Sequence, residues 1–202
     1  MNLNDFLIPT GDVCRRPGPF DRIVLSSRVR LARNLQDSPF PGRANKSERQ
    51  NLLQTMKPVI ESLRSMKEGF SEELSKLKRL EKQILVERHL ISRELASKSQ
   101  GSAIVLSVDE TFCVMINEED HLRMQAILPG LQIKEAWKSM NKMDTMLESK
   151  LPIAFSSDFG YLTACPTNLG TGIRVSAMLH LPGLVMAEHM QQTITAVNKL
   201  GL

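Results

Sequence analysis

The sequence predicts a protein of the α+β class, and three observations carry that prediction. Residues 22–33 alternate polar and apolar side chains, as a half-buried strand does. Residues 102–120 contain two apolar runs on either side of an acidic turn, which is typical of a β-hairpin. Residues 47–63 and 133–147 repeat apolar side chains at three- and four-residue steps, which indicates amphipathic helices. Mixed helices and strands with at least one antiparallel pair favour the α+β class.

The composition fits a globular protein, and its positive charge favours an anionic ligand. The 202 residues are 42% hydrophobic and 24% charged, enough for one sizeable domain or two small ones. The net charge of +4 suits an anionic ligand such as a nucleotide, whereas no Lys/Arg block with interleaved aromatics points to nucleic acid. The three cysteines form no CxxC pair, which disfavours a disulfide framework or a zinc site and favours the cytoplasm. No apolar stretch approaches 18 residues and the N-terminus lacks a signal-peptide pattern, so no membrane segment is expected.

The chain is expected to begin with an irregular arm and to continue as one domain. Residues 1–20 are rich in Pro and Gly, and residues 21–202 hold all the predicted elements. In the first strand Ser26, Arg28 and Arg30 share one face. Two interpretations of these arginines stand: a solvated edge strand, or a fork of guanidiniums that binds phosphate oxygens. Because the sequence has no P-loop and no GxGxxG motif, a bound nucleotide would be held by arginines.

The first predicted helix has a clear start signal. Ser47 and Gln50 match a capping box with Ser47 as the N-cap, and Pro58 is expected to kink the helix. Residues 67–98 combine mixed charge with leucines at helical spacing, which predicts one or two helices with solvated faces. His89 lies in this segment, and its simplest interpretation is a histidine on a helix surface.

The segment NEEDHLR, residues 117–123, directly follows the second strand of the hairpin. It places three consecutive carboxylates, residues 118–120, at a strand end, and Arg123 adds a cation. A surface loop is the alternative interpretation. His121 has no second His or Cys at ligand spacing, so a metal site is disfavoured.

The C-terminal third is expected to be mixed. Residues 133–147 carry an apolar stripe that includes Trp137 and is assigned to the core. Residues 153–166 suggest two short strands around an Asp-Phe-Gly turn. A helix is predicted from about Gly172 and another after Pro182.

The segment TACPTNLGTG, residues 163–172, leaves the role of Cys165 open. A lone cysteine is often a small buried hydrophobe. Here turn- and cap-forming residues separate Cys165 from the helix predicted at Gly172, with Arg174 on its first turn. A thiol beside a helix N-terminus has a lowered pKa, and the N–H groups of such a loop can hold an anion.

Taken together, the stretches SSRVR (26–30), NEEDHLR (117–123) and CPTNLGT (165–171) resemble the signature segments of the ATP:guanido phosphotransferase, or phosphagen kinase, family. VERHLISRELA (86–96) and GTGIRVSAMLHLPGL (170–184) are similar to a bacterial branch of that family whose substrates are arginines in proteins. The resemblance covers about residues 20–202. It implies an antiparallel β-sheet flanked by helices, of the glutamine synthetase-like kind, and incomplete at the C-terminus.

The resemblance also implies roles for particular residues. Glu119 would bind the guanidinium and orient or deprotonate it, and Cys165 would lie against it and tune the site without forming a covalent intermediate. The nucleotide side would comprise Ser26, Arg28, Arg30, His89, Arg123 and Arg174. ATP and Mg²⁺ are the implied cofactors.

The implied activity is phosphorylation of exposed arginines in proteins, which marks them for Clp-type proteolysis. An activator protein, a Clp ATPase and a homodimer of the full-length form are the implied partners. The chain ends at Leu202, before a downstream glycine-rich segment with a further arginine that the family carries, so a truncated domain is expected. A non-catalytic fragment that binds nucleotide or arginine-bearing partners is one alternative. A kinase for a small guanidino metabolite is another, although only 25 residues precede SSRVR.

Overall fold

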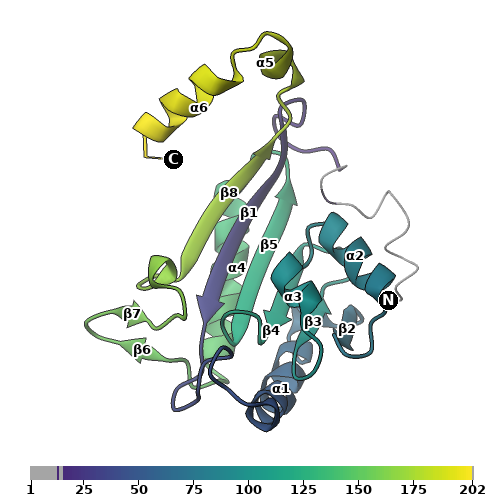
Figure 1. The fold of residues 1–202 in the computed structure, drawn as a ribbon, viewed down its shortest axis with the longest axis vertical. Helices are drawn as coiled ribbons and strands as arrows, with labels where there is room; N and C mark the ends of the chain where they lie inside the picture. Colours follow the sequence, from purple (N-terminus) through teal and green to yellow (C-terminus); the bar gives the residue numbers. More distant parts are fainter. Residues whose placement is uncertain (1–12, 14–15, 202) are drawn as a thin grey trace.

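A computed structural model describes residue 13 and residues 16–201. Its centre is a six-stranded antiparallel sheet with the strand order β2-β3-β4-β5-β1-β8 (Figure 1). The strands are β1 (Val24–Arg33), β2 (Phe70–Glu73), β3 (Ala103–Leu106), β4 (Phe112–Ile116), β5 (Leu122–Pro129) and β8 (Ile173–Leu179). The predicted α+β class is therefore confirmed, as are the first strand and the hairpin.

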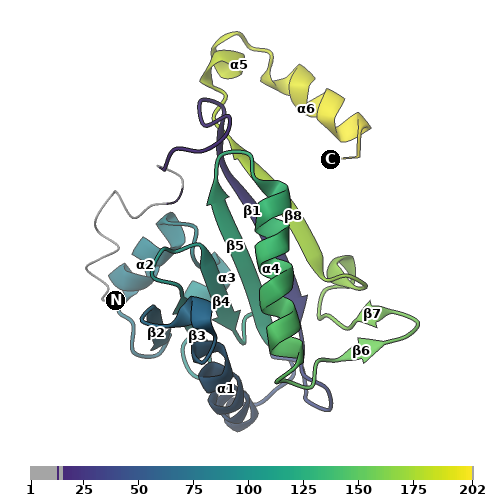
Figure 2. The same cartoon turned by 180° about the vertical axis from the view of Figure 1, so that it is seen from behind.

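Helices cover the two faces of the sheet unequally. On one face lie α1 (Lys46–Glu61) and α4 (Ile133–Glu148), as Figure 2 shows from behind. On the other face α2 (Arg79–Glu87) and α3 (Arg93–Ser97) pack over β3 and β4. In the described part of the chain, no helix covers the front of β5, β1 and β8 in Figure 1. This uncovered half of the front face holds the candidate site.

The remaining elements lie at the margins of the sheet. A small hairpin consists of β6 (Phe155–Ser156) and β7 (Gly160–Tyr161), close to the two short strands expected. Beyond β8, α5 (Pro182–Met186) and α6 (Met190–Lys199) project from the end of the sheet (Figure 1). Single 3₁₀ turns occur at Arg64–Met66 and Pro166–Asn168.

Strand alternation produces two hydrophobic cores. Val29 and Leu31 of β1 point to the α1/α4 side, where they join Met56 and Met140 in the larger cluster. The smaller cluster lies between α2, α3 and the strands β3 and β4. Trp137, which was assigned to the core stripe, is 39% exposed, so that assignment is wrong. It stands one residue beyond the buried Ala136, on the outer side of α4.

The start of α1 differs from the expectation by two residues. Asn45 is the N-cap: its side chain accepts from the backbone N–H of Glu48 at 2.9 Å, and the Glu48 carboxylate accepts from the N–H of Asn45 at 2.7 Å. The capping box is real, but Asn45 and Glu48 form it, not Ser47 and Gln50.

The largest correction concerns residues 173–179, which form strand β8 and not a helix. Gly172 turns the chain into this strand with a φ of 64°, and a Cβ there would lie 2.7 Å from the carbonyl oxygen of Ala32. The apolar side chains recur at every second position from Ile173 to Leu179, a strand period that pairing with β1 satisfies. Residues 67–98 also differ from the prediction, because β2 precedes the two helices.

A buried ion pair fixes α4 to β1. Arg33 donates through Nη2 to Asp144 Oδ2 at 2.6 Å and through Nε to Oδ1 at 3.1 Å. Its guanidinium also lies 3.4 Å from the ring centroid of Tyr161 and donates to the carbonyl oxygen of Thr171. One side chain thus ties together β1, α4, the β6–β7 hairpin and the start of β8.

Candidate active site

Four arginines occupy the uncovered half of the front face. Arg28 and Arg30 come from β1, Arg123 from β5 and Arg174 from β8. The strand register places Arg30 opposite Arg174 and pairs Arg28 with Ser176, to whose hydroxyl it donates at 3.4 Å. The structure therefore brings together all four arginines to which the resemblance gives a phosphate-binding role.

The cluster is electrostatically strained without an anion. Burial, followed by the positive charges of Arg28, Arg123 and Arg174, lowers the pKa of Arg30 to about 10. The Nε of Arg30 is buried and has no hydrogen-bond partner among the described residues. Repulsion and an unused buried donor would both be relieved by phosphate oxygens.

Glu118 holds one of these arginines in place. Its carboxylate is fully buried and accepts from Nη1 of Arg123 at 2.6 and 2.8 Å. The hydroxyl of Ser92 also donates to this carboxylate, and the amine of Lys98 donates to the backbone carbonyl oxygen of Glu118. Burial raises the pKa of Glu118, but the bonds from Arg123 and Ser92 outweigh it, so the pKa is lowered and the group is ionised.

Asp120 links the acidic segment to the cysteine loop. Its Oδ1 accepts from the side-chain amide of Asn34 at 2.6 Å and from the backbone N–H of Ala164 at 2.7 Å. His121 is equally structural, since its Nδ1 accepts from the backbone N–H of Leu35 at 3.0 Å. Of the three carboxylates in this segment, Glu119 alone is left to face a cavity without a side-chain hydrogen bond among the described residues.

Glu119 and Cys165 line one small cavity with the arginines. This cavity measures about 100 Å³, and its walls include Arg30, Glu119, Arg123, Cys165 and Arg174. Burial raises the pKa of Glu119, and the neighbouring Asp120, Glu94 and Glu118 raise it further. A carboxylate with a raised pKa is a better proton acceptor, which is the property a general base needs.

Cys165 sits at this cavity in a different setting from the one expected. It is half-buried, and its Sγ lies 3.0 Å from the hydroxyl oxygen of Thr167. The element that follows is a single 3₁₀ turn, Pro166–Asn168, because the helix predicted from Gly172 is strand β8. No α-helix begins beside this thiol in the described part of the chain, so the prediction that a helix dipole acts on it is wrong. Arg174 reaches the site from a strand.

The remaining predicted residues line an adjoining cavity of about 220 Å³. Ser26, Arg28 and His89 lie there with Ser176. His89 is exposed with a φ of 59°, two residues beyond the end of α2, and its carbonyl oxygen accepts from Gln125 at 3.1 Å. The structure thus groups the eight predicted residues in two neighbouring cavities along β1.

A third and larger cavity lies on the other side of Glu119. Its volume is about 670 Å³, and it is lined by Pro39, Phe40, Gly42, Arg43, Glu94, Lys98, Glu118, Glu119 and Ala164. The sequence analysis assigned no role to Ser92, Glu94 or Lys98. The sequence signal that could have located this segment is Ser92, a typical N-cap residue. Its hydroxyl accepts from the backbone N–H of Leu95 and so fixes the start of α3.

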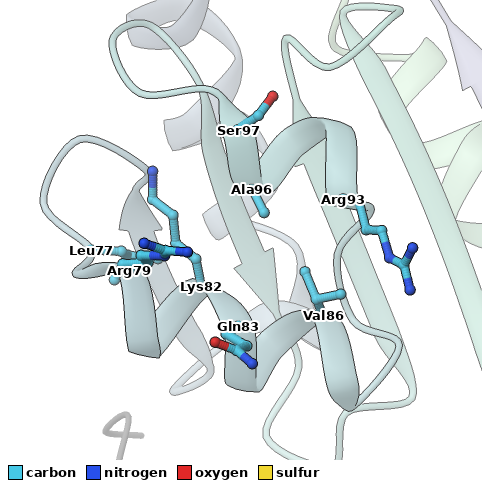
Figure 3. A pocket seen from close by; sticks show the side chains of 8 residues that line it. All are labelled: Leu77, Arg79, Lys82, Gln83, Val86, Arg93, Ala96 and Ser97. Carbon is cyan, nitrogen blue, oxygen red and sulfur yellow. The ribbon is translucent and has the colours of Figure 1, made fainter.

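A separate cavity of about 430 Å³ lies between α2 and α3 (Figure 3). Arg79 and Lys82 line one end of it, while Arg93 points away from them, so the three cations do not converge on one anion. None of the predicted site residues lines it.

The described residues contain neither a metal-binding cluster nor a membrane-spanning helix. No group of three or more His, Cys, Asp or Glu side chains among residues 16–201 is arranged to hold a metal ion. Within the same part of the chain, none of the helices has the length and apolar character needed to cross a bilayer.

Solved structures similar to this chain include a taurocyamine kinase and a lombricine kinase. The duplicated taurocyamine kinase of Schistosoma mansoni with bound transition-state analogue components matches with a TM-score of 0.76 and 25% identity, over 95% of this chain and 28% of that one. Lombricine kinase matches with a TM-score of 0.69 and 25% identity, over 87% of this chain and 53% of that one. The fold and the arginine-lined site thus define a phosphagen kinase catalytic domain.

The sequence model of the ATP:guanido phosphotransferase C-terminal catalytic domain matches residues 51–202, and the chain belongs to this family. It is 49% identical over 188 residues to a protein-arginine kinase of Pelotomaculum thermopropionicum, with 92% of this chain and 53% of that one covered. It is 42% identical over 196 residues to a protein-arginine kinase of Brevibacillus brevis, with 96% and 55% covered. The chain spans about half the length of these relatives.

Proposed function

We propose that the chain carries the catalytic site of a protein-arginine kinase, which transfers the γ-phosphoryl group of ATP to arginine side chains of proteins. One observation carries this proposal: three arginines, Arg30, Arg123 and Arg174, line the same cavity as the carboxylate of Glu119, whose pKa is raised, and the fourth, Arg28, lines the neighbouring cavity. The arginines suit the polyphosphate, and the carboxylate suits a guanidinium. The curated relatives named protein-arginine kinase support the choice of substrate.

Phosphoryl transfer depends on alignment and neutralisation of charge. Arg28, Arg30, Arg123 and Arg174 would hold the phosphates of ATP in line with the attacking nitrogen. Glu119 would take a proton from the guanidinium as the N–P bond forms and the bond to the β-phosphate oxygen breaks. ADP and phosphoarginine would be the products. Ser26 and His89 would line the nucleotide side of the site.

Cys165 would act through its charge or polarity and not as a nucleophile. It lines the same cavity as Glu119 and as Arg30 of β1 and Arg174 of β8. A thiol at this point can make contact with the guanidinium and hold it in place while the phosphoryl group arrives. A covalent phosphocysteine is not required, because the guanidinium nitrogen can attack the γ-phosphorus directly as the bond to the β-phosphate oxygen breaks.

Mg²⁺ would enter as part of the substrate, MgATP. Glu118, the buried carboxylate paired with the arginine cluster, already accepts from Arg123 and Ser92. The described residues offer no cluster of metal-binding side chains. Mg²⁺ commonly keeps several waters and binds mainly through substrate phosphates, which fits such a site.

The wider setting is also part of the proposal. Residues 21–202 would form the catalytic domain, and the protein would act in the cytoplasm. The arm expected over residues 1–20 falls mostly outside the described residues. Phosphorylated clients would be handed to Clp-type proteolysis, with an activator protein and a Clp ATPase as partners. A homodimer would be a property of the full-length form.

The test is a phosphoarginine assay on the chain with MgATP and an unfolded, arginine-rich protein. Phosphoarginine is identified by ³¹P NMR and by its lability to acid and stability to alkali. The proposal predicts this product on the protein, with free arginine competing weakly. Phosphorylation of free arginine or taurocyamine in preference to protein would instead favour a metabolite kinase, as in the structural neighbours. Nucleotide binding without any product would favour a non-catalytic fragment.

A further inference from the structure

A second cavity beside the site shares the side chain of Glu119 with the arginine cavity. The arginine cluster lies on one side of this carboxylate, in the cavity shared with Cys165. On the other side, the cavity of about 670 Å³ is lined by Glu119 and by Glu94 of α3. Glu119 therefore lines both the arginine cavity and a second cavity whose charged walls are Glu94, Glu118, Arg43 and Lys98.

The carboxylates around Glu119 are not equally available to a ligand. The Glu118 carboxylate accepts hydrogen bonds from Arg123, and the Asp120 carboxylate accepts from the side chain of Asn34 and the backbone N–H of Ala164. Glu94 differs from both: its side chain is 55% exposed, and among the described residues its one ion pair is with Lys98, at a loose 3.7 Å. An exposed pair at that distance contributes little, so Glu94 can exchange it for another cation.

Lys98 has a stronger bond elsewhere. Its amine donates to the carbonyl oxygen of Glu118, which keeps it on the backbone of the acidic segment. Glu94 is close enough to Glu119 for its charge to raise the pKa of that carboxyl. Because both carboxylates line the same cavity, a guanidinium that enters it, with five N–H donors in a planar fork, could interact with both.

The wall facing these carboxylates suits the stem of an arginine side chain. Pro39 and Phe40 provide apolar surface on the same cavity, and Phe40 is held edge-on against the His121 ring. Methylene groups of an arginine can lie along such a surface while the charged head reaches the carboxylates.

From this arrangement we infer that Glu94 is a specificity-determining residue that binds the guanidinium of the incoming arginine side chain, together with Glu119, in the cavity between α3 and the loop of residues 39–43. The inference rests on the proposed function, because it names the entrance used by that substrate. It adds a contact from α3, an element that carries none of the predicted site residues.

The experiment compares two peptides that differ only in charge at one position, one with arginine and one with its neutral analogue citrulline. Their affinities for the ADP-bound chain are measured by calorimetry. Glu94→Gln should weaken binding of the arginine peptide about fivefold, the size expected for one partly exposed charge pair. It should leave the affinities for the citrulline peptide and for ADP unchanged. Glu94→Asp should recover part of the loss.

Glu135→Gln is the matched control. Glu135 is also an exposed carboxylate that pairs loosely with a lysine on its own helix, at 4.0 Å from Lys138, but it lies on α4 behind the sheet. This variant should bind both peptides as the wild type does. A general loss of helix stability would affect both variants alike, whereas loss confined to Glu94→Gln and to the arginine peptide reports recognition of charge.

The outcomes separate the inference from the proposed function. If the wild type forms phosphoarginine and Glu94→Gln binds the arginine peptide as tightly, the inference is overturned and the proposed function stands. If the wild type binds ADP but does not distinguish arginine from citrulline, both are overturned.

Discussion

Arg30 of β1 lies directly opposite Arg174 of β8, so two guanidiniums face the same side of adjacent strands at one register position. Like charges at such positions repel one another. Burial and the surrounding arginines lower the pKa of Arg30 to about 10, which records the cost of this arrangement. The sheet accepts repulsion at this point, and a bound polyphosphate would remove it.

This pair predicts opposite effects of one substitution on stability and on binding. Arg174→Ala should raise the Tm of the nucleotide-free chain by a degree or so, because it removes about 0.5 kcal/mol of repulsion. It should also weaken ADP binding at least tenfold, since a charge-assisted contact to phosphate is lost. Thermal denaturation with and without ADP measures both effects.

Arg22→Ala is the control for Arg174→Ala, because Arg22 is exposed and lies before β1, outside the cluster. It should change neither the Tm nor the affinity. A lower Tm for nucleotide-free Arg174→Ala would contradict the view that the arginines repel one another.

Asp120 should be essential for activity without touching the substrate. Asp120→Ala would release the N–H of Ala164 and the amide of Asn34, and the Cys165 loop would lose its anchor to the acidic segment. We expect turnover to fall at least a hundredfold, because misplacement of a reacting group by about 1 Å is that costly. ADP affinity should change less than threefold, because the arginines are held by the sheet. Similar turnover in this variant would show that the anchor is dispensable.

The Arg33–Asp144 pair should contribute strongly to stability. Both side chains are almost fully buried, at 3% and 7% exposure. Asp144→Ala leaves the Arg33 charge buried without its partner and should cost about 3–5 kcal/mol. Urea denaturation measures the change, with the exposed Glu135→Gln on the same helix as the control. A loss below about 1 kcal/mol would mean that Tyr161 and water compensate for the missing carboxylate.

The thiols should differ sharply in reactivity. Cys165 is half-buried at the cavity, whereas Cys113 is 1% exposed and burial raises the pKa of its thiol. Iodoacetamide should therefore label Cys165 and not Cys113, as located by peptide mass spectrometry. ADP together with an arginine peptide should slow the labelling of Cys165. Unchanged labelling in their presence would place Cys165 outside the substrate site.

The sequence predicted those parts of the fold whose pattern is local. The alternation in residues 22–33 and the hairpin in 102–120 both appear as strands where expected, because their apolar side chains are buried in the cores beside the sheet. The helix prediction for residues 173–179 rested on the turn- and cap-forming residues that precede them. Their alternation of Ile, Val, Ala and Leu was the correct signal. Strand β2 was hidden because its four residues, FSEE, carry no apolar period of their own.

For the candidate site, the sequence identified which residue types could act but not how they are held. Arg28 and Arg30 share a face by strand period alone, so their grouping was predictable. The meeting of Arg30 with Arg174 was not, since it depends on pairing between strands about 145 residues apart. The pairing of Glu118 with Arg123 likewise follows from the return of the chain into β5, which single-sequence periodicity does not report.

The most direct test of the account is the phosphoarginine assay repeated with Glu119→Gln, beside ADP affinity measured on the same sample. Glutamine keeps the shape of Glu119 but cannot take the proton. We predict loss of phosphoarginine formation by at least a hundredfold with ADP affinity unchanged. In the wild type, activity should fall as pH decreases through the pKa of Glu119, which burial and its acidic neighbours raise above the ordinary range for glutamate. Turnover by Glu119→Gln at the wild-type rate would contradict the account, because the proton would then have another acceptor.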